Sequence, residues 1–410
     1  MTLSFTKYIC SIIYIFIVLT PINTHANTTE IKSWLNLKTK KSFPIYKYYD
    51  DSPNRYSGIQ IYKDTNNISS QLTLNTSNKK KIFFDNSYLE YNHMNSVIGI
   101  GKINRQWSFS PFSSLILSTN ARPSSSVYFN ISSDKKPKKL FLSLLGPWSF
   151  EAFNSLLSNN NGPQNPMLLG FRATVKPLNN LKFELVKTSQ WGGKGYGSNI
   201  SQLSSAILGN TNENKNSEIN QLAGLGFSYI SNFDSFPLKF YGQFVGEDEA
   251  GNLPSCFMSL YGAELTFDKA IYLTKIGFEI IDTRIDYTRN KNCGPNTAYM
   301  NGVYEYTNYD TVLGAPIDTE SKSVLFWGTT QLTNNININY STNNIILNDS
   351  NWSRHRLSNS KQEGWHSTLG STWKVNSLTF QSNISYQNYI LPMHNISEGL
   401  SINFKTTYDF

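Results

Sequence analysis

The C-terminal residues of this chain alternate strictly between two kinds of side chain. Every second residue from Leu400 to Phe410 lies on one face, and most of these are apolar, whereas the residues between them are polar. The same period of two is present in 167–175, 223–229 and 336–340, and it persists from about Tyr56 to the last residue. Successive side chains of a strand point to opposite faces, so this pattern predicts β-strands with one apolar and one polar face.

A membrane barrel and a soluble sandwich would both alternate, but three further features favour the barrel. Short turns, such as residues 176–180, alternate with long polar stretches, such as 196–220, 246–255 and 341–363; short periplasmic turns and long outer loops are typical of outer-membrane barrels. The chain ends on an aromatic residue, Phe410. Aromatic residues are also frequent where strands end, as girdles require. The examples are Tyr299, Tyr304, Tyr306, Tyr386 and Tyr389.

The predicted fold class is therefore all-β, a transmembrane antiparallel β-barrel. About 18 strands of 9 to 11 residues would use the length of the chain as one domain, residues 56–410. No apolar stretch after Leu19 is long enough for a spanning helix. In lipid, only helices and closed barrels satisfy every backbone hydrogen-bonding group.

Residues 1–26 are predicted to be a signal peptide. Lys7 precedes an apolar run from Ile9 to Leu19, and small side chains stand before the cleavage site at Ala26. The run is shorter than the roughly 20 residues that a spanning helix needs, and Cys10 lies where no lipid would be attached. We expect a mature chain outside the cytoplasm and without a lipid anchor.

An N-terminal segment, residues 27–55, is predicted to be periplasmic and helical at its start. Asn27 and Glu30 have the spacing of a capping-box variant, after which Ile31, Trp34 and Leu35 fall on one helical face.

Two later segments are also predicted to form helices. Ser149 could cap a helix with Phe150, Phe153, Leu156 and Leu157 on one side, and Asn199 with Gln202 could start another with Leu203, Ala206 and Ile207 inward. We expect these short helices to plug the barrel or to cover its periplasmic side. The alternative is that they lie in loops and leave the lumen unaffected.

Charged residues are few, and Ser, Asn and Thr supply most of the polar surface. Charged residues make up 16% of the chain and aromatic residues 14%. The chain has a net charge of +8, and Lys7 is the one charged residue of the signal peptide, so the mature chain would have +7. A positive balance favours anionic neighbours such as an acidic polysaccharide or lipopolysaccharide.

Motifs for catalysis, metals or nucleotides are weak or missing. Gly192–Gly197 lacks the Ser or Thr that follows the lysine of a phosphate-binding loop, so we interpret it as a tight turn in which glycine permits a positive φ. Glu247–Glu249 could supply the paired carboxylates of a glycosidase or bind calcium, but three acidic residues in an exposed loop are most simply a solvated loop. The motifs CxxC, HExxH and GxSxG do not occur. We predict no enzyme activity, no metal and no cofactor.

Cys256 and Cys293 are the cysteines that remain after the signal peptide is removed. In an oxidising compartment they could form one disulfide, or they could remain as two separate loop cysteines.

Residues suited to binding sugars gather between positions 105 and 197. Sugars are held by aromatic faces and planar polar side chains, and Arg also pairs with the carboxylates of acidic polysaccharides. The glycan-binding candidates are Trp107, Asn120, Arg122, Arg172, Gln190, Trp191 and Lys194. The alternative is that Arg172 and Arg122 pair with lumen acids such as Glu184 or Glu151 and merely fill the barrel.

The same region carries a series of short motifs in a specific order. They are RQW at 105–107, SLILSTNARP at 114–123, GPWSF at 146–150, GFR at 170–172 and QWGGKG at 190–195. The series continues with QLAG at 221–224, GEDEAG at 246–251, LPS at 253–255, NGVY at 301–304 and LG at 313–314. In order and spacing, these motifs resemble the capsule assembly Wzi family of outer-membrane proteins.

The resemblance implies an 18-stranded barrel in the bacterial outer membrane, closed by helices on its periplasmic side. It also implies non-catalytic attachment or organisation of capsular polysaccharide at the cell surface. Two positions differ from the family pattern: Ala315 stands where a His is expected, and residues 108–111 replace a Gly-Pro. These differences concern glycan specificity rather than the fold.

Other functions remain as alternatives. A porin-like or polysaccharide-transport channel would need an open lumen, and a barrel enzyme would need converging acids or a Ser/His pair. The expected partners are surface polysaccharide, outer-membrane lipid or lipopolysaccharide, and the assembly machinery that reads an aromatic C-terminus such as Phe410. We expect a monomer with no nucleic-acid partner.

Overall fold

The computed structural model describes residues 28–43, 55–77, 82–139, 142–159, 162–208, 219–231, 233, 236–250, 253–269, 272–285 and 293–410. The predicted signal peptide, residues 1–26, lies outside these described residues, as do residues 44–54 of the predicted N-terminal segment.

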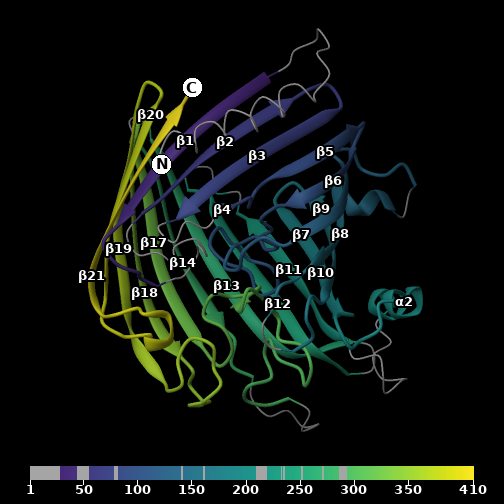
Figure 1. Ribbon diagram of the computed structural model, residues 1–410. Helices are drawn as coiled ribbons and strands as arrows, with labels where there is room; N and C mark the ends of the chain where they lie inside the picture. Colours follow the sequence, from purple (N-terminus) through teal and green to yellow (C-terminus); the bar gives the residue numbers. More distant parts are fainter. Residues whose placement is uncertain are drawn as a thin grey trace, which may run out of the picture.

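Antiparallel strands make up most of the described chain, as the period of two predicts (Figure 1). Those of the main sheet are β1 (Thr28–Lys38), β2 (Arg55–Asp64), β3 (Ile68–Ser77), β4 (Ile82–Phe83), β5 (Tyr88–His93), β6 (Ser96–Lys102), β7 (Ser125–Ser133), β8 (Trp148–Leu156), β9 (Met167–Leu178), β10 (Leu181–Trp191), β11 (Asn220–Ile230), β12 (Leu238–Ala250), β13 (Leu253–Lys269), β14 (Tyr272–Asp282), β17 (Lys322–Thr333), β18 (Ile336–Leu347), β19 (Gln362–Val375), β20 (Leu378–Gln387) and β21 (Gly399–Asp409). The smaller elements are η2 (Leu142–Leu145), α2 (Ile200–Leu208), β15 (Thr307–Asn308), β16 (Thr311–Val312) and η3 (Pro392–His394).

The main sheet closes on itself. Apart from β4, which pairs only with β3 among the described residues, each strand of this sheet pairs with the next one along the chain, and β1 pairs with both β2 and β21, with Lys32 opposite Asp409. The described residues form 19 strands in this sheet, but β4 and β5 both pair with β3 and share one position. The chain is therefore an 18-stranded barrel, which confirms the predicted fold class.

The predicted N-terminal helix is wrong, because Thr28–Lys38 is strand β1. Leu35 and Leu37 are exposed on the outer face, and Asn36 between them is buried in the lumen. A helix here would leave the edges of β2 and β21 without partners, and unpaired edge groups are costly in lipid. Barrel closure therefore decides the conformation.

Short and long connections mostly alternate between the two ends of the barrel, and residues 134–147 between β7 and β8 are an exception. Turns of two residues join β9 to β10, β17 to β18 and β19 to β20, whereas more than ten residues separate β10 from β11 and β18 from β19. We call these the short-turn end and the long-loop end. The predicted long loop at 246–255 is wrong in part, since β12 and β13 extend to Ala250 and Leu253 as one hairpin.

Apolar side chains cover the outside of the barrel. Leu185, Leu369, Trp373 and Ile402 are all more than two-fifths exposed, as a lipid-facing surface requires. Of the aromatic residues predicted to lie in girdles, Tyr386 is exposed. The other four are at most 4% exposed, and that prediction is wrong for them. Tyr299, Tyr304 and Tyr306 belong to a loop that folds into the lumen.

Of the two helices predicted later in the chain, after Ser149 and after Asn199, only the second is present. Helix α2 begins after Asn199, whose side chain accepts the backbone N–H of Gln202 at 3.0 Å, as predicted. Ala206 is buried, but Ile207 is 45% exposed rather than inward. The helix predicted after Ser149 is wrong, because β8 occupies those residues.

Helix α2 also lies in a different place from the one expected. It follows β10 at the long-loop end and packs outside the wall, where Ala206 joins Leu169, Trp191 and Ile219 (Figure 1). It therefore neither plugs the barrel nor covers the periplasmic side. Among the described residues, no helix has the length and apolar character needed to cross a membrane.

Candidate functional site

Two long connections fold back from the long-loop end and fill one side of the lumen. The first plug segment, residues 103–124, joins β6 to β7; the second, described over residues 293–321, joins β14 to β17. Leu115, Ile116 and Leu117 are at most 4% exposed although they lie in no strand. A barrel of this width leaves a lumen that must be either open or filled, and these segments fill part of it.

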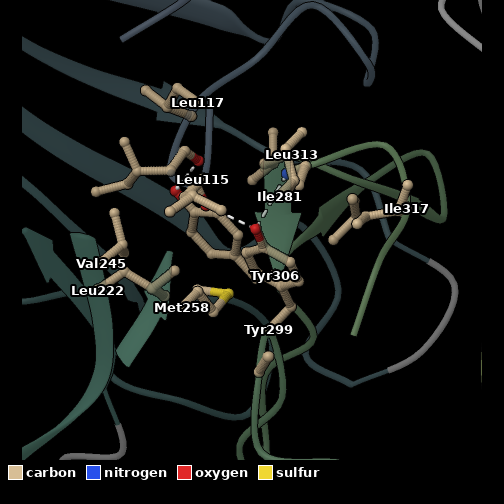
Figure 2. Packing of buried hydrophobic residues seen from close by; sticks show 14 of the residues in the cluster. Leu115, Leu117, Leu222, Val245, Met258, Ile281, Tyr299, Tyr306, Leu313 and Ile317 are labelled. Carbon is tan, nitrogen blue, oxygen red and sulfur yellow. Dashed lines mark hydrogen bonds between the residues drawn. The ribbon is translucent and has the colours of Figure 1, made fainter. Parts of the chain in front are cut away.

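Tyr299 and Tyr306 hold the two plug segments together (Figure 2). Their rings stack with centroids 5.9 Å apart, and both side chains are fully buried. The Tyr299 hydroxyl donates to the Leu115 carbonyl oxygen at 2.8 Å, and the Tyr306 hydroxyl donates to that of Ile116 at 3.0 Å. The Tyr306 hydroxyl also shares a hydrogen bond of 2.9 Å with Thr188 on β10. The pair thus ties both segments to the wall.

Polar side chains on β8 to β14 anchor the first plug segment. Gln243 accepts the backbone N–H of Leu115 at 2.8 Å, and Trp107 donates its indole N–H to Glu151 at 3.0 Å. Ser110 donates a hydrogen bond to Glu279. These three wall side chains, Glu151, Gln243 and Glu279, therefore have hydrogen-bond partners in the plug, as buried polar groups generally do.

The predicted lumen-facing residues Arg172 and Gln190 do point inward. Arg172 forms an ion pair with Glu184, whose side chain is fully buried, with 2.7 Å between Nη2 and Oε2. Gln190 donates to the backbone oxygen of Glu305 at 2.9 Å. The Arg172–Glu184 pair is the barrel-filling alternative that the sequence left open.

The other glycan-binding candidates lie apart from one another. Arg122 pairs with Asp85 at 3.1 Å, not with Glu151, which pairs with Arg105. Asn120 donates to the Val312 carbonyl oxygen at 3.0 Å, and Trp191 donates to Asn154 on the outer side of the wall at 3.3 Å. Lys194 alone among the seven candidates has an exposed side chain. Their glycan-binding role stays a prediction.

The glycine run and the two cysteines are structural features of the long-loop end. Gly192, Gly193 and Gly195 all have positive φ angles, of 67°, 97° and 91°, which glycine adopts without steric cost. Turn geometry alone therefore accounts for this run. Cys256 and Cys293 form a disulfide with their Cα atoms 5.4 Å apart, which joins β13 to the second plug segment.

A buried polar cluster fixes the loop between β18 and β19 to the second plug segment. His355 is buried; its Nε2 contacts the Thr319 carbonyl oxygen at 2.9 Å, and its Nδ1 accepts the Leu357 N–H at 3.2 Å. This arrangement fits a neutral imidazole. Arg356 binds the carboxylate of Asp318, with Nε 2.9 Å from Oδ2.

We expect this cluster to make the barrel less stable as the pH falls. Burial lowers the pKa of His355 below its ordinary 6.5, so below about that pH the unfolded chain binds the proton first and gains in relative stability. Burial alone would raise the pKa of Asp318, but Arg356, together with His355 and the backbone N–H of Thr319, outweighs burial and lowers the pKa below 3.8. The stability that the ionised Asp318 contributes is therefore lost only in stronger acid. Melting temperatures between pH 8 and 5 should fall less in His355→Gln than in wild type. Equal slopes would contradict the assignment.

The opposite side of the lumen, on β17 to β21, is lined mainly by uncharged polar side chains, with Lys374 and Lys405 at inward-facing positions nearer the short turns. The inward-facing positions of neighbouring strands form rows, such as Ser341, Thr368, Ser385 and Ser401 across β18 to β21. Gly370 lies beneath the amides of Asn339 and Asn383, where a Cβ atom would clash with both. Glycine at this position lets the two amides meet over the wall.

A polar cavity of about 280 Å³ opens beside these rows. Its lining comes from β17 to β21, from the last residue of β1 and the chain just after it, and from Phe112 of the first plug segment. The lining residues are Lys38, Ser42, Phe43, Phe112, Leu325, Ser341, Asn343, His366, Thr368, Asn383, Ser385, Ser401 and Asn403. Sequence reasoning missed them because each strand shows only an ordinary polar face, and pairing alone brings the faces together.

The family comparison decides where this barrel belongs. The family model described as capsule assembly protein Wzi matches residues 43–390. The chain belongs to the Wzi family. A relative from Klebsiella pneumoniae, an uncharacterized 55.8 kDa protein in the cps region, is 29% identical over 190 residues. That match spans 46% of this chain and 38% of the relative's length.

Solved structures share the Wzi-family fold at low sequence identity. Wzi of Escherichia coli, an outer-membrane, carbohydrate-binding β-barrel involved in group 1 capsule assembly, matches with a TM-score of 0.79 and 20% identity, over 93% of this chain and 84% of that one. OccD3 of Pseudomonas aeruginosa matches with a TM-score of 0.53 and 10% identity, over 94% of this chain and 92% of that one. OccAB3 of Acinetobacter baumannii matches with a TM-score of 0.53 and 9% identity, over 94% of this chain and 100% of that one. The chain therefore has the fold of outer-membrane barrels.

Within the described part of the chain, no group of three or more His, Cys, Asp or Glu side chains is placed to hold a metal ion.

Proposed function

We propose that this protein binds capsular or a related surface polysaccharide and holds it at the outer membrane, without cleaving it. The family match over residues 43–390 carries the proposal. Its support is the fold shared with E. coli Wzi, which is a carbohydrate-binding barrel. A lumen with one side packed and the other lined by amides and hydroxyls also suits a binding protein.

The partners follow from the surface chemistry. The long-loop end faces outward by the usual orientation of these barrels, so the exposed Lys194 is the candidate among the seven for direct contact with polymer or lipopolysaccharide. Phe410 directly follows strand β21, and its backbone N–H donates to the carbonyl oxygen of Ile31 on β1 at 2.9 Å. We propose that the assembly machinery reads this terminus and that the barrel works as a monomer.

Deletion of the gene should release surface polysaccharide from the cells that make this protein. The measurement is the ratio of cell-bound to released polymer after gentle centrifugation, with total polymer as the control for synthesis. We expect a several-fold fall in the ratio and recovery on complementation. Unchanged retention would contradict the proposed function.

A further inference from the structure

We propose that the polar cavity beside β17 to β21 binds the uncharged end of a glycan chain that enters the lumen from the short-turn end. This inference rests on the proposed function and goes beyond it by naming the site, the class of sugar and the side of entry. The chemistry of the lining, the direction of the opening and the polar atoms that the wall leaves to a ligand support this site.

The lining is suited to hydroxyl-rich ligands without charge. Among the described residues that line the cavity, Lys38 has the one permanently charged side chain, and no carboxylate is present. Asn343, Asn383 and Asn403 offer amides that both donate and accept, and the serine and threonine hydroxyls do the same. An acidic sugar would need an Arg fork or several cations, whereas neutral hydroxyl and N-acetyl groups match this set.

The burial of the inward-facing residues shows which end is open. On β18, Asn337 and Asn339 near the short turn are exposed, Ser341 and Asn343 are half-buried, and Ile345 and Leu347 near the long loop are buried. The cavity is thus a pocket that is open toward the short turns and closed by apolar side chains toward the long loops. A chain end fits such a pocket, and a running polymer does not.

Two aromatic residues, Phe43 and Phe112, are among the lining of the cavity. Phe112 is partly exposed and packs edge-on against Trp327, with ring centroids 4.9 Å apart. Phe43 is buried, and its backbone N–H donates to Gln387 at 3.0 Å, which fixes the chain after β1 to β20. The apolar face of a sugar ring can pack against such an aromatic surface while its hydroxyl groups reach the strands.

Two polar atoms of the lining have no hydrogen-bond partner among the described residues. They are Nε2 of His366, a residue that is 6% exposed, and Oδ1 of Asn403. Both residues line the cavity. Since buried polar groups normally have partners, a ligand hydroxyl that meets these atoms would gain hydrogen bonds at little cost to the protein. The volume is near the lower limit of the roughly 300–1,000 Å³ of small-molecule sites.

Calorimetric titration of the full chain in detergent micelles tests the proposal. The probes are two neutral oligosaccharides, maltohexaose and hexa-N-acetylchitohexaose, and one anionic oligosaccharide, hexagalacturonate. We expect at least one neutral probe to bind, with at least tenfold higher affinity than hexagalacturonate. The double variant Asn343→Leu/Asn383→Leu should weaken this binding at least tenfold.

The matched control places the same two leucines one residue away, where the side chains face lipid: Asn344→Leu/Ser382→Leu. It should bind like wild type. Because the lumen double variant could fold poorly, Ser385→Ala removes one lining hydroxyl with little change of volume and should weaken binding by a few-fold. Heat-modifiable migration in gels reports whether each variant is a folded barrel.

Failure of this inference can be told apart from failure of the proposed function. If no neutral probe binds, if hexagalacturonate binds best, or if the lumen variants bind like wild type, the pocket assignment is wrong, even where deletion still releases polysaccharide. If deletion leaves polysaccharide retention unchanged, the proposed function fails, whatever the titrations show. A separate experiment tests the side of entry. In the variant Asn339→Cys, the new thiol should react with a membrane-impermeant maleimide only after the outer membrane is permeabilised. Labelling in intact cells would overturn entry from the short-turn end.

Discussion

Tyr306→Ala should lower the stability of the barrel by about 3–5 kcal/mol and raise its conductance, because a buried aromatic ring is lost from the plug. Its hydroxyl contacts Ile116 and Thr188, so the change also removes one of the hydrogen-bonded connections between the plug and β10. Wild-type protein in planar bilayers should show no large ohmic pore. The variant should show frequent openings, and its denaturant midpoint should fall.

Tyr306→Phe is the control for this prediction. It keeps the ring and its stacking on Tyr299 but loses the hydroxyl hydrogen bonds, each of which contributes about 1 kcal/mol. We expect a smaller loss of stability and a conductance close to that of wild type. A large conductance in wild-type protein, or no difference between the Ala and Phe variants, would show that the plug segments do not close the lumen.

Glu184→Leu should destabilise the protein by about 3–5 kcal/mol, because it leaves the Arg172 guanidinium without its carboxylate in a poorly solvated part of the lumen. The Glu184 side chain is fully buried and that of Arg172 is 20% exposed. Glu184 also accepts a hydrogen bond from Gln243 at 3.1 Å. Denaturant unfolding in lipid vesicles, followed by tryptophan fluorescence, would measure the loss.

The double variant Arg172→Met/Glu184→Leu separates the two interpretations of Arg172. If the ion pair only fills the barrel, removing both charges should restore most of the stability and leave polysaccharide retention as in wild type. Restored stability with lost retention would instead show that Arg172 contacts the glycan. A double variant as unstable as Glu184→Leu would contradict the view that the unpaired charge is the cause.

The barrel itself could be predicted from the sequence because its signal is local. Residues 400–410 show the period of two, and turns such as residues 178–181 follow directly from the Asn residues at their tips. Helix α2 could be predicted for the same reason, since Asn199 and Gln202 make a reciprocal cap within four residues. In these cases one short stretch contains all the information.

The errors arose where a distant partner decides the outcome. Residues 28–38 fit a helical face through Ile31, Trp34 and Leu35 equally well, but β21 requires a strand there. Ser149 could cap a helix, yet β7 and β9 flank residues 148–156 on both sides and make them a strand.

The lumen was the least predictable part of the structure. The apolar run at 115–117 suggests a strand, and its place in the plug depends on Tyr299 and Tyr306, which follow more than 180 residues later. The candidate residues on β9 and β10 could be placed on the lumen side by counting, but their partners could not. The polar cavity was missed for the same reason, since four hairpins must pair before its rows exist.

Retention of surface polysaccharide decides whether this barrel is a glycan-holding protein. Cells that lack the gene should be compared with cells complemented by the wild-type protein and by the Tyr306→Ala variant, at equal levels of folded protein in the outer membrane. We expect the deletion to shift most of the polymer from the cell-bound to the released fraction, and the wild-type protein to return it. Equal cell-bound fractions with and without the protein, at unchanged total polymer, would contradict the proposed function.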